Sequence, residues 1–126
     1  MASDPFALPD LTNPGWAARP DGMKVWDVTV GTGDECPPGT TVTVHYTGWL
    51  LDGSVFDSSR KRGQTISFGL NQVIKGWTVG VPGMKKGGKR LLHIPPDMAY
   101  GKRGAPGAIP PDSTLVFEIE LVDFRK

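Results

Sequence analysis

The stretch TTVTVHYTGWL, residues 40–50, decides the fold class because apolar and polar side chains alternate along it. Alternation with a period of two is typical of a β-strand that has one face on a core and the other face toward polar surroundings. We therefore expect a strand with one apolar and one polar face. The apolar face carries Val42, Val44 and Tyr46, and the polar face carries Thr43, His45 and Thr47.

Four further segments have the composition of strands, rich in β-branched and aromatic residues and bounded by turn residues. After the turn LDG the chain also extends into SVFD (54–57), whereas GTGDECPPG (31–39) is expected to be a loop. In the last strand, Leu115, Phe117, Ile119 and Leu121 share one face. The four segments are KVWDVTV (24–30), TISF (65–68), KRLLHIP (89–95) and STLVFEIELVDF (113–124).

Only LNQVIKGW, residues 70–77, has the pattern of a helix, with Asn71 placed to cap its start. The chain shows no repeat, no heptads and no alternation of strands with helices. Its 17 glycines and 12 prolines suit short strands joined by turns. An antiparallel sheet with one apolar face needs a cover, and the single helix supplies it. The sequence therefore predicts an α+β fold of about five antiparallel strands and one short α-helix.

At 126 residues the chain fits one domain. We expect residues 1–22, which are Pro-rich and aperiodic, to form an arm, and residues 23–126 to form the folded domain. The start has acids and prolines where a signal peptide has cations and an apolar core. No apolar run approaches the ~18 residues of a membrane span. These features predict a cytoplasmic protein without a membrane segment, although a mature secreted domain that lacks its signal peptide would look the same.

The net charge of +1 is unevenly distributed, because the middle of the chain is basic and its two ends are acidic. Residues 60–103 hold ten Lys or Arg against one acid, Asp97, whereas the rest holds four against twelve. The clusters RKR (60–62), KKGGKR (85–90) and KR (102–103) raise the hypothesis of a nucleic-acid or acidic-partner surface. A solvated face is the commoner meaning of such runs, so we do not expect a nucleic-acid partner.

Several stretches that resemble catalytic or ligand-binding motifs lack residues that those motifs require. GMKKGGKR (83–90) resembles a phosphate loop but has Arg90 where Ser or Thr must bind magnesium, and a strand follows it instead of a helix. His45 and His93 have no metal-ligand partners at suitable spacing, and His93 is expected to be a hydrogen-bonded core or interface residue. The single cysteine, Cys36, excludes an internal disulfide. We therefore expect no metal and no cofactor.

The aromatic residues are more informative. VTVHYTGWLLDGSVFDSS, QVIKGW and AYGKRGAPGAIPPDSTLVFEIEL resemble motifs of the FKBP-type (tacrolimus- and rapamycin-binding) peptidyl-prolyl cis-trans isomerases. The resemblance runs from about Met23 to Arg125, with the motifs in the family's order. It implies a five- to six-stranded antiparallel sheet curled around one short α-helix, with an apolar pocket between them. It also implies that the chain is an enzyme that rotates Xaa-Pro bonds without covalent chemistry and assists protein folding.

The resemblance also assigns roles to residues of this chain. Trp77 would form the pocket floor. The Ile74 amide and the Tyr100 hydroxyl would bind peptide carbonyls, while Asp57 would lie at the pocket edge with Tyr46 and Arg62 as partners. The catalytic set is Tyr46, Phe56, Asp57, Ile74, Trp77, Tyr100 and Phe117, and the substrate-binding set is Arg62, Ile66, Phe68, Val73 and Ile109.

The implied partners are proline-containing polypeptides and the macrolides rapamycin and tacrolimus, and we expect a monomer by default. Some residues depart from the family pattern and bear on drug affinity and substrate preference more than on activity. They are Ile66, where an aromatic is common, Gln72, where a glutamate is common, and the small residues Ala105 and Ala108 of the flap, the segment between Pro95 and Ile109. An alternative hypothesis is a docking module that binds a partner protein through the same pocket or flap.

Overall fold

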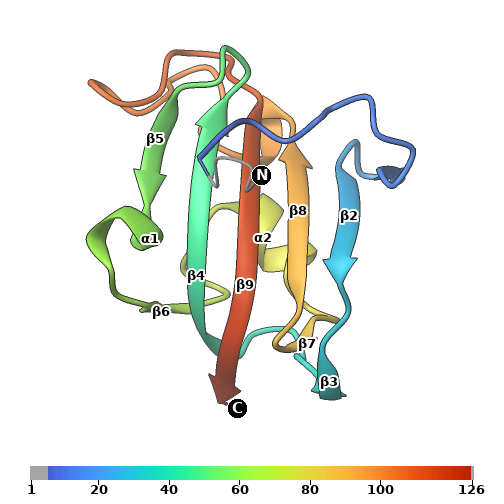
Figure 1. Cartoon of the computed structure of the whole chain (residues 1–126). Coiled ribbons are helices and arrows are strands. Elements are labelled where there is room, and N and C mark those ends of the chain that lie inside the picture. Colours follow the sequence, from blue (N-terminus) through green and yellow to red (C-terminus); the bar gives the residue numbers. More distant parts are fainter. Residues whose placement is uncertain (1–5, 126) are drawn as a thin grey trace.

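The computed structural model describes residues 6–125 and is built around one antiparallel sheet (Figure 1). The strand order is β1-β2-β8-β9-β4-β5. Strand β6 lies outside this order and pairs with β4 on the edge that β5 also uses. The seven strands are β1 (Ala17–Ala18), β2 (Lys24–Thr29), β4 (Thr41–Leu50), β5 (Val55–Ser58), β6 (Ile66–Gly69), β8 (Lys89–Ile94) and β9 (Leu115–Arg125). The remaining elements are β3 (Thr32–Glu35) and β7 (Lys85–Lys86), which pair with each other, the helices α1 (Ser59–Arg62) and α2 (Lys75–Gly80), and the 3-10 turn η1 (Pro96–Met98).

The central pair of strands, β4 and β9, confirms the alternation predicted from sequence. Val42, Val44 and Tyr46 are buried, and so are the four predicted core residues of β9. The register shifts by one residue between Thr43 and Val44, where Val122 is the extra residue in β9 and points to solvent. Such a bulge increases the local twist of the pair. The predicted fold class, a curled antiparallel sheet with a short helix, is confirmed.

Helix α2 lies against one face of the sheet, behind it in the view of Figure 1. Two glycines allow this close approach. A Cβ at Gly76 would lie 2.6 Å from Ile94 Cδ1, and one at Gly80 would lie 2.9 Å from Met23 Cε. Larger residues at either position would push the helix away from the sheet. The close approach of α2 to the sheet therefore depends on the absence of side chains at these two positions of the helix.

The predicted helix boundary was wrong. Residues 70–72 form a turn, closed by a hydrogen bond from Gln72 N–H to the Gly69 carbonyl (2.9 Å), and α2 begins at Lys75. Asn71 is not its cap, because the N-cap residue is Ile74, which makes no side-chain capping bond. The helix also continues past Trp77 to Gly80.

The structure also contains short elements that the sequence did not predict. The segment 31–39, expected to be a loop, contains strand β3, which pairs with β7. The basic run RKR (60–62) lies in the single-turn helix α1, whose N-cap Ser58 accepts a hydrogen bond from Lys61 N–H. Gly63 ends this turn in the left-handed conformation (φ 73°), which glycine adopts without strain.

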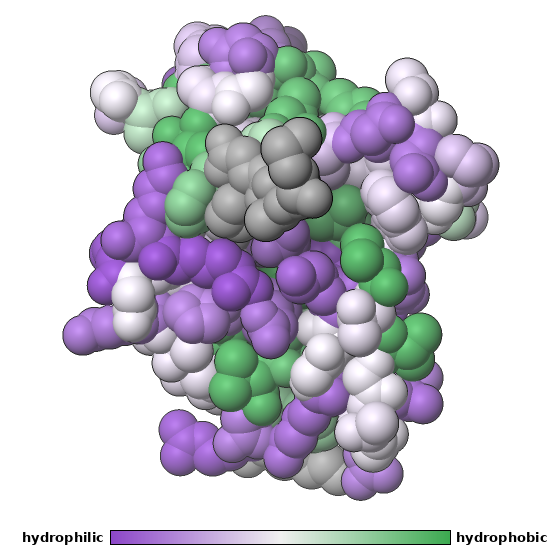
Figure 2. Space-filling model, viewed as in Figure 1, coloured by the Kyte–Doolittle hydropathy of each residue, from purple (hydrophilic) through white to green (hydrophobic). Residues whose placement is uncertain are grey.

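The N-terminal segment crosses the outer face of the sheet, opposite α2 (Figure 1). Trp49 donates its indole N–H to the Phe6 carbonyl (2.9 Å), and Trp16 packs edge-on against Trp26 and His93. Figure 2 shows this outer face, where hydrophilic side chains extend across the middle and hydrophobic residues form separate small patches. Residues 1–5 of the predicted arm, and Lys126, lie outside the described residues.

One predicted contact of the outer face is corrected by the structure. His93 was expected to be hydrogen-bonded, but its Nδ1 atom is buried and has no partner among residues 6–125. The imidazole packs edge-on against the indole of Trp16, with ring centroids 6.1 Å apart, so an aromatic ring occupies one side of it. Within the same described range, no helix is long and apolar enough to cross a membrane.

Candidate functional site

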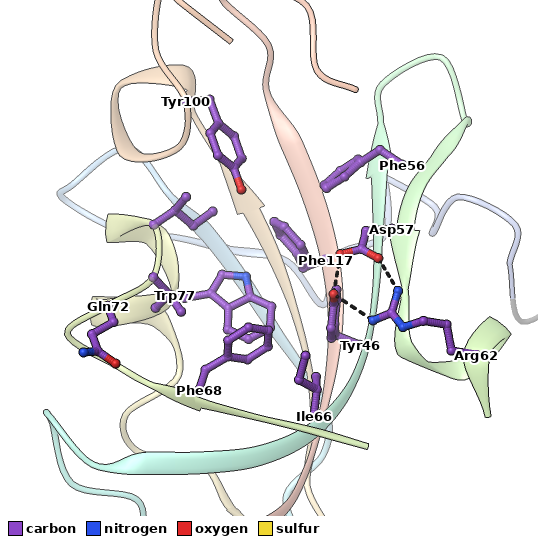
Figure 3. Close-up of a pocket in the computed structure, with 12 residues that line it drawn as sticks. Tyr46, Phe56, Asp57, Arg62, Ile66, Phe68, Gln72, Trp77, Tyr100 and Phe117 are labelled. Atoms are coloured by element: carbon purple, nitrogen blue, oxygen red, sulfur yellow. Dashed lines mark hydrogen bonds and ion pairs between the residues drawn. The ribbon is translucent and has the colours of Figure 1, made fainter. Parts of the chain in front are cut away.

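A pocket of about 640 Å³ opens beside α2, between the helix, the sheet and the flap after β8 (Figure 3). Its walls are mostly apolar and aromatic, and a few polar groups converge at its edge, which is the composition of a typical ligand site. The lining residues are Tyr46, Phe56, Asp57, Arg62, Ile66, Phe68, Gln72, Val73, Ile74, Trp77, Tyr100 and Phe117.

The floor of the pocket is an aromatic cluster centred on Trp77, whose side chain is only 3% exposed. Tyr46, Phe68 and Phe117 each contact this indole edge to face, with ring centroids 5.4, 5.4 and 5.3 Å away. Phe56 extends the wall by an edge-on contact with Phe117 at 5.5 Å. Edge-to-face pairs of this kind contribute about 0.5–1.5 kcal/mol beyond burial, so these ring contacts stabilise the cluster.

Gly48 makes this cluster possible. It lies in β4, opposite Phe117 of β9 on one side and Asp57 of β5 on the other. A Cβ at this position would lie 2.6 Å from the Phe56 Cζ atom and 2.8 Å from the Phe117 Cε1 atom. The missing side chain is therefore the space into which the two rings fit.

A hydrogen-bonded trio closes one edge of the pocket (Figure 3). The Tyr46 hydroxyl donates to Asp57 Oδ2, and Arg62 donates to Asp57 Oδ1 (2.6 Å) and to the Tyr46 hydroxyl (3.2 Å). Local structure places these groups together. Asp57 is in β5 beside β4, and the turn of α1 brings Arg62 back toward the carboxylate.

The trio fixes the charge of Asp57. Burial opposes ionisation of this carboxyl, but the hydrogen bonds from Tyr46 and Arg62 outweigh burial and hold its pKa below the ordinary value. Burial, and then the hydrogen bond to Asp57, raise the pKa of the Tyr46 phenol. At neutral pH Asp57 is therefore an anion and Tyr46 a neutral donor. This assignment excludes Asp57 as a general acid at that pH.

Three polar groups at the pocket have no partner among residues 6–125. They are the Ile74 N–H, the Tyr100 hydroxyl, which points into the pocket in Figure 3, and the buried Nε1–H of Trp77. Ile74 directly precedes α2 in an extended conformation, so its N–H is not used by the helix. Unpaired donors beside an apolar cavity are groups that a bound carbonyl can satisfy.

The structure brings together all the sequence-predicted site residues except one. Ile109 is not among the described pocket-lining residues. It is 5% exposed and packs in the core, where its backbone exchanges hydrogen bonds with Ala105 (both 2.8 Å). Gln72 lines the pocket although it was not in the predicted set. In the sequence, Gln72 stood out only as a departure from the family pattern, at a position where a glutamate is common. The role of Gly48 had no sequence signal, because it depends on strand register.

Comparison with known proteins agrees with this geometry. The sequence profile of the family described as FKBP-type peptidyl-prolyl cis-trans isomerase matches residues 33–122. A protein of Neisseria meningitidis serogroup B (strain MC58), named FK506-binding protein, is 54% identical over 103 residues, which cover 80% of this chain and 94% of that protein.

Two solved structures have the same fold. FkpA from Escherichia coli superimposes with a TM-score of 0.85 at 46% identity, covering 90% of this chain and 53% of that one. A peptidyl-prolyl cis-trans isomerase from Pseudomonas syringae pv. tomato gives a TM-score of 0.83 at 41% identity. The match covers 91% of this chain and 84% of that one. On the profile match and these identities, the chain belongs to the FKBP-type peptidyl-prolyl cis-trans isomerase family.

Proposed function

We propose that this isomerase rotates Xaa-Pro bonds inside the aromatic pocket, with the prolyl ring over Trp77. The observation that carries the proposal is the combination of an apolar floor with unpaired donors, the Ile74 N–H and the Tyr100 hydroxyl, at its rim. Those donors would hold the carbonyls of an extended peptide on either side of the proline. The apolar cluster would hold the ring.

The physics of the reaction suits such a site. Rotation about an amide C–N bond meets a barrier of about 18–20 kcal/mol because the bond has partial double-bond character. The planar amide is more charge-separated than the twisted one, so an apolar environment disfavours the planar form relative to the transition state. A pocket that excludes water from the amide therefore lowers the barrier without a nucleophile. Tyr46, Phe56 and Phe117 would shape this surface.

The polar trio has an electrostatic role in this proposal. Asp57 remains an anion at the pocket edge, and its negative charge lies near the place where the prolyl amide would twist. Arg62 balances that charge and, with Tyr46, fixes the direction of the carboxylate. The trio would therefore favour the charge distribution of the twisted amide over that of the planar one.

We also propose that rapamycin and tacrolimus bind this pocket and compete with substrate. The support is the residue set, together with relatives named for binding FK506, which is tacrolimus. Ile66 forms part of the wall, and Ala105 and Ala108 lie in the flap, so these three positions would set the affinity. Proline-containing polypeptides are the proposed natural partners.

The test is isomerisation of a short Leu-Pro peptide, measured by NMR exchange with and without rapamycin. We expect catalysis that the drug abolishes. Catalysis that the drug does not affect would contradict macrolide binding and point to a wall remodelled at Ile66. A folded sample without catalysis would overturn the enzymatic role of the pocket and favour the docking module.

A monomeric state and a cytoplasmic location complete the proposal. Cys36, the single cysteine, is a buried free thiol, which suits a reducing compartment. Burial is the main cause that raises the pKa of this thiol, so it is held protonated and unreactive. Sedimentation of the purified chain and fractionation of producing cells would test the two statements separately.

A further inference from the structure

One edge of β4 has a gap between its two strand partners. Strand β6 pairs with this edge as far as Val44, opposite Ile66, and β5 begins to pair at Thr47, opposite Ser58. His45 and Tyr46 lie between the two ladders. Because Tyr46 uses its N–H on this edge, its carbonyl points to the same edge and away from β9. Tyr46 is only 4% exposed, so water does not compensate for the missing strand.

The hydroxyl of Ser59 fills this gap. Tyr46 N–H donates to Ser59 Oγ (2.7 Å), and Ser59 Oγ donates back to the Tyr46 carbonyl at 3.3 Å. The same oxygen lies 3.0 Å from His45 Nδ1. Ser59 itself is completely buried. It is the first residue of α1, directly after β5, so the chain leaves the sheet at the point where a side chain can replace a strand (Figure 1).

The hydrogen bonds from Ser59 involve the backbone of Tyr46, a residue that shapes the proposed catalytic site. The backbone of Tyr46 is bonded to Ser59, while its phenol donates to Asp57 and packs against Trp77. Ser59 does not line the pocket. Without its hydroxyl, both backbone groups of Tyr46 would be buried and unpaired, a state that costs free energy unless the strand shifts. A shift of β4 here would move the phenol away from the carboxylate.

We propose that Ser59 is a positioning residue of the isomerase, and that its hydroxyl holds β4 in the register at which Tyr46 meets Asp57. This inference rests on the proposed function of the pocket. It assigns to Ser59 an effect on catalysis in addition to the stability that any buried hydrogen bond contributes.

The chain offers a matched control in Thr47. This residue is in the same strand, next to Tyr46, and is also completely buried. Its hydroxyl is 2.9 Å from Ser58 Oγ, whereas the hydrogen bonds of the Tyr46 backbone on this edge go to Ser59 Oγ. Thr47→Val removes a buried hydroxyl of the same kind while keeping the side-chain shape. A purely structural role of Ser59 predicts that the two variants behave alike.

The experiment compares Ser59→Ala with Thr47→Val, using Leu-Pro peptide turnover corrected for the folded fraction measured by urea unfolding. We expect kcat/KM of Ser59→Ala to fall about tenfold, mainly in kcat, because an unpaired buried group costs enough to displace the strand. Thr47→Val should stay within about twofold of the wild type. Equal losses in both variants, or a Ser59→Ala value within twofold of the wild type, would overturn the proposal.

A second readout does not depend on activity. The Asp57 carboxyl is followed by carbon-13 NMR through an acid titration of the same three proteins. In Ser59→Ala its pKa should rise, because the Tyr46 hydroxyl no longer stabilises the carboxylate, and in Thr47→Val it should not change. An unchanged value in both variants would contradict the positioning role, even if the wild type proved inactive.

A third variant covers the case in which Ser59→Ala does not fold. Ser59→Cys fills the same space, but its thiol is a weak donor and acceptor. We expect a loss of kcat and a rise in the Asp57 pKa in the same direction as for Ser59→Ala. If a folded Ser59→Cys protein kept the wild-type kcat and the wild-type pKa of Asp57, the proposal would be overturned.

Discussion

The Tyr46 hydroxyl donates a hydrogen bond to the Asp57 carboxylate across the neighbouring strands β4 and β5. This bond joins an apolar surface to a fixed negative charge, because the same tyrosine ring packs against Trp77 at the pocket floor. Arg62 completes the arrangement from α1. The strands β4 and β5 and the helix α1 that directly follows β5 are thus held in one geometry by two side-chain hydrogen bonds to one carboxylate.

Removal of this carboxylate should lower activity and leave the fold. For Asp57→Val we expect kcat/KM to fall at least about tenfold, since a hydrogen bond to a charged group is worth about 1.5–3 kcal/mol. Turnover of the Leu-Pro peptide measures the loss, and circular dichroism checks the fold. Asp123→Val is the control, because Asp123 also forms an ion pair, with Lys86 (2.9 Å), but lies outside the pocket. A similar loss in both variants would remove the specific role of Asp57.

The pH dependence of the Asp57 contribution has a defined sign. Its folded-state pKa is lower than the unfolded value of about 3.9, so the carboxylate stabilises the fold above that pH. The stabilisation is lost as the pH falls through the folded-state pKa. We expect the difference in unfolding free energy between wild type and Asp57→Asn to be constant from pH 7 to 5 and to shrink below about pH 4. Urea unfolding at each pH measures it, and a constant difference down to pH 2.5 would contradict the ionised trio.

The sequence predicted the strands well because burial on one face imposes a period of two, as in residues 40–50. It misplaced the start of α2, because Asn71 was expected to cap the helix. Asn71 lies in a turn closed by the hydrogen bond from Gln72 N–H to the Gly69 carbonyl, and the helix begins only at Lys75. Ile109, an apolar residue of the flap that was assigned to the pocket, is only 5% exposed and is not among the described residues that line it.

Gly48 and Ser59 escaped sequence reasoning altogether. Their roles come from atoms that meet across strands, the rings of Phe56 and Phe117 for the glycine and the backbone of Tyr46 for the serine. Such contacts depend on register and on the place where one strand partner replaces another. Neither is visible in the periodicity of a single segment.

The space at Gly48 leads to a stability prediction. Gly48→Ala places a Cβ where the Phe56 and Phe117 rings now lie, so the pocket wall must move. We expect a loss of about 1–3 kcal/mol in unfolding free energy, the usual cost of overpacking, with a fall in kcat/KM. Urea unfolding and Leu-Pro turnover measure the two effects. Wild-type stability and activity in Gly48→Ala would show that the wall is more plastic than the close contacts imply.

The N-terminal segment should stabilise the domain without acting on the pocket. Trp16 packs against Trp26 and His93 on the outer face, away from α2. For Trp16→Ala we expect a loss of about 1–3 kcal/mol, less than for a fully buried tryptophan, and an unchanged kcat/KM per folded molecule. Val30→Ala, at an exposed position, is the control and should change stability little. Lower turnover by folded Trp16→Ala would instead indicate that this segment influences the pocket.

His93 should make stability fall in mild acid. Burial, and then the positive charge of Lys24, hold its pKa below the ordinary value of about 6.5. The unfolded chain therefore takes up a proton first as the pH falls, and the folded state loses stability from about pH 6.5 down to the folded-state pKa. We expect urea unfolding to show this decline between pH 7 and 5 in the wild type. His93→Phe, which keeps an aromatic ring beside Trp16, should reduce the decline. An equal decline in the variant would mean that other groups cause it.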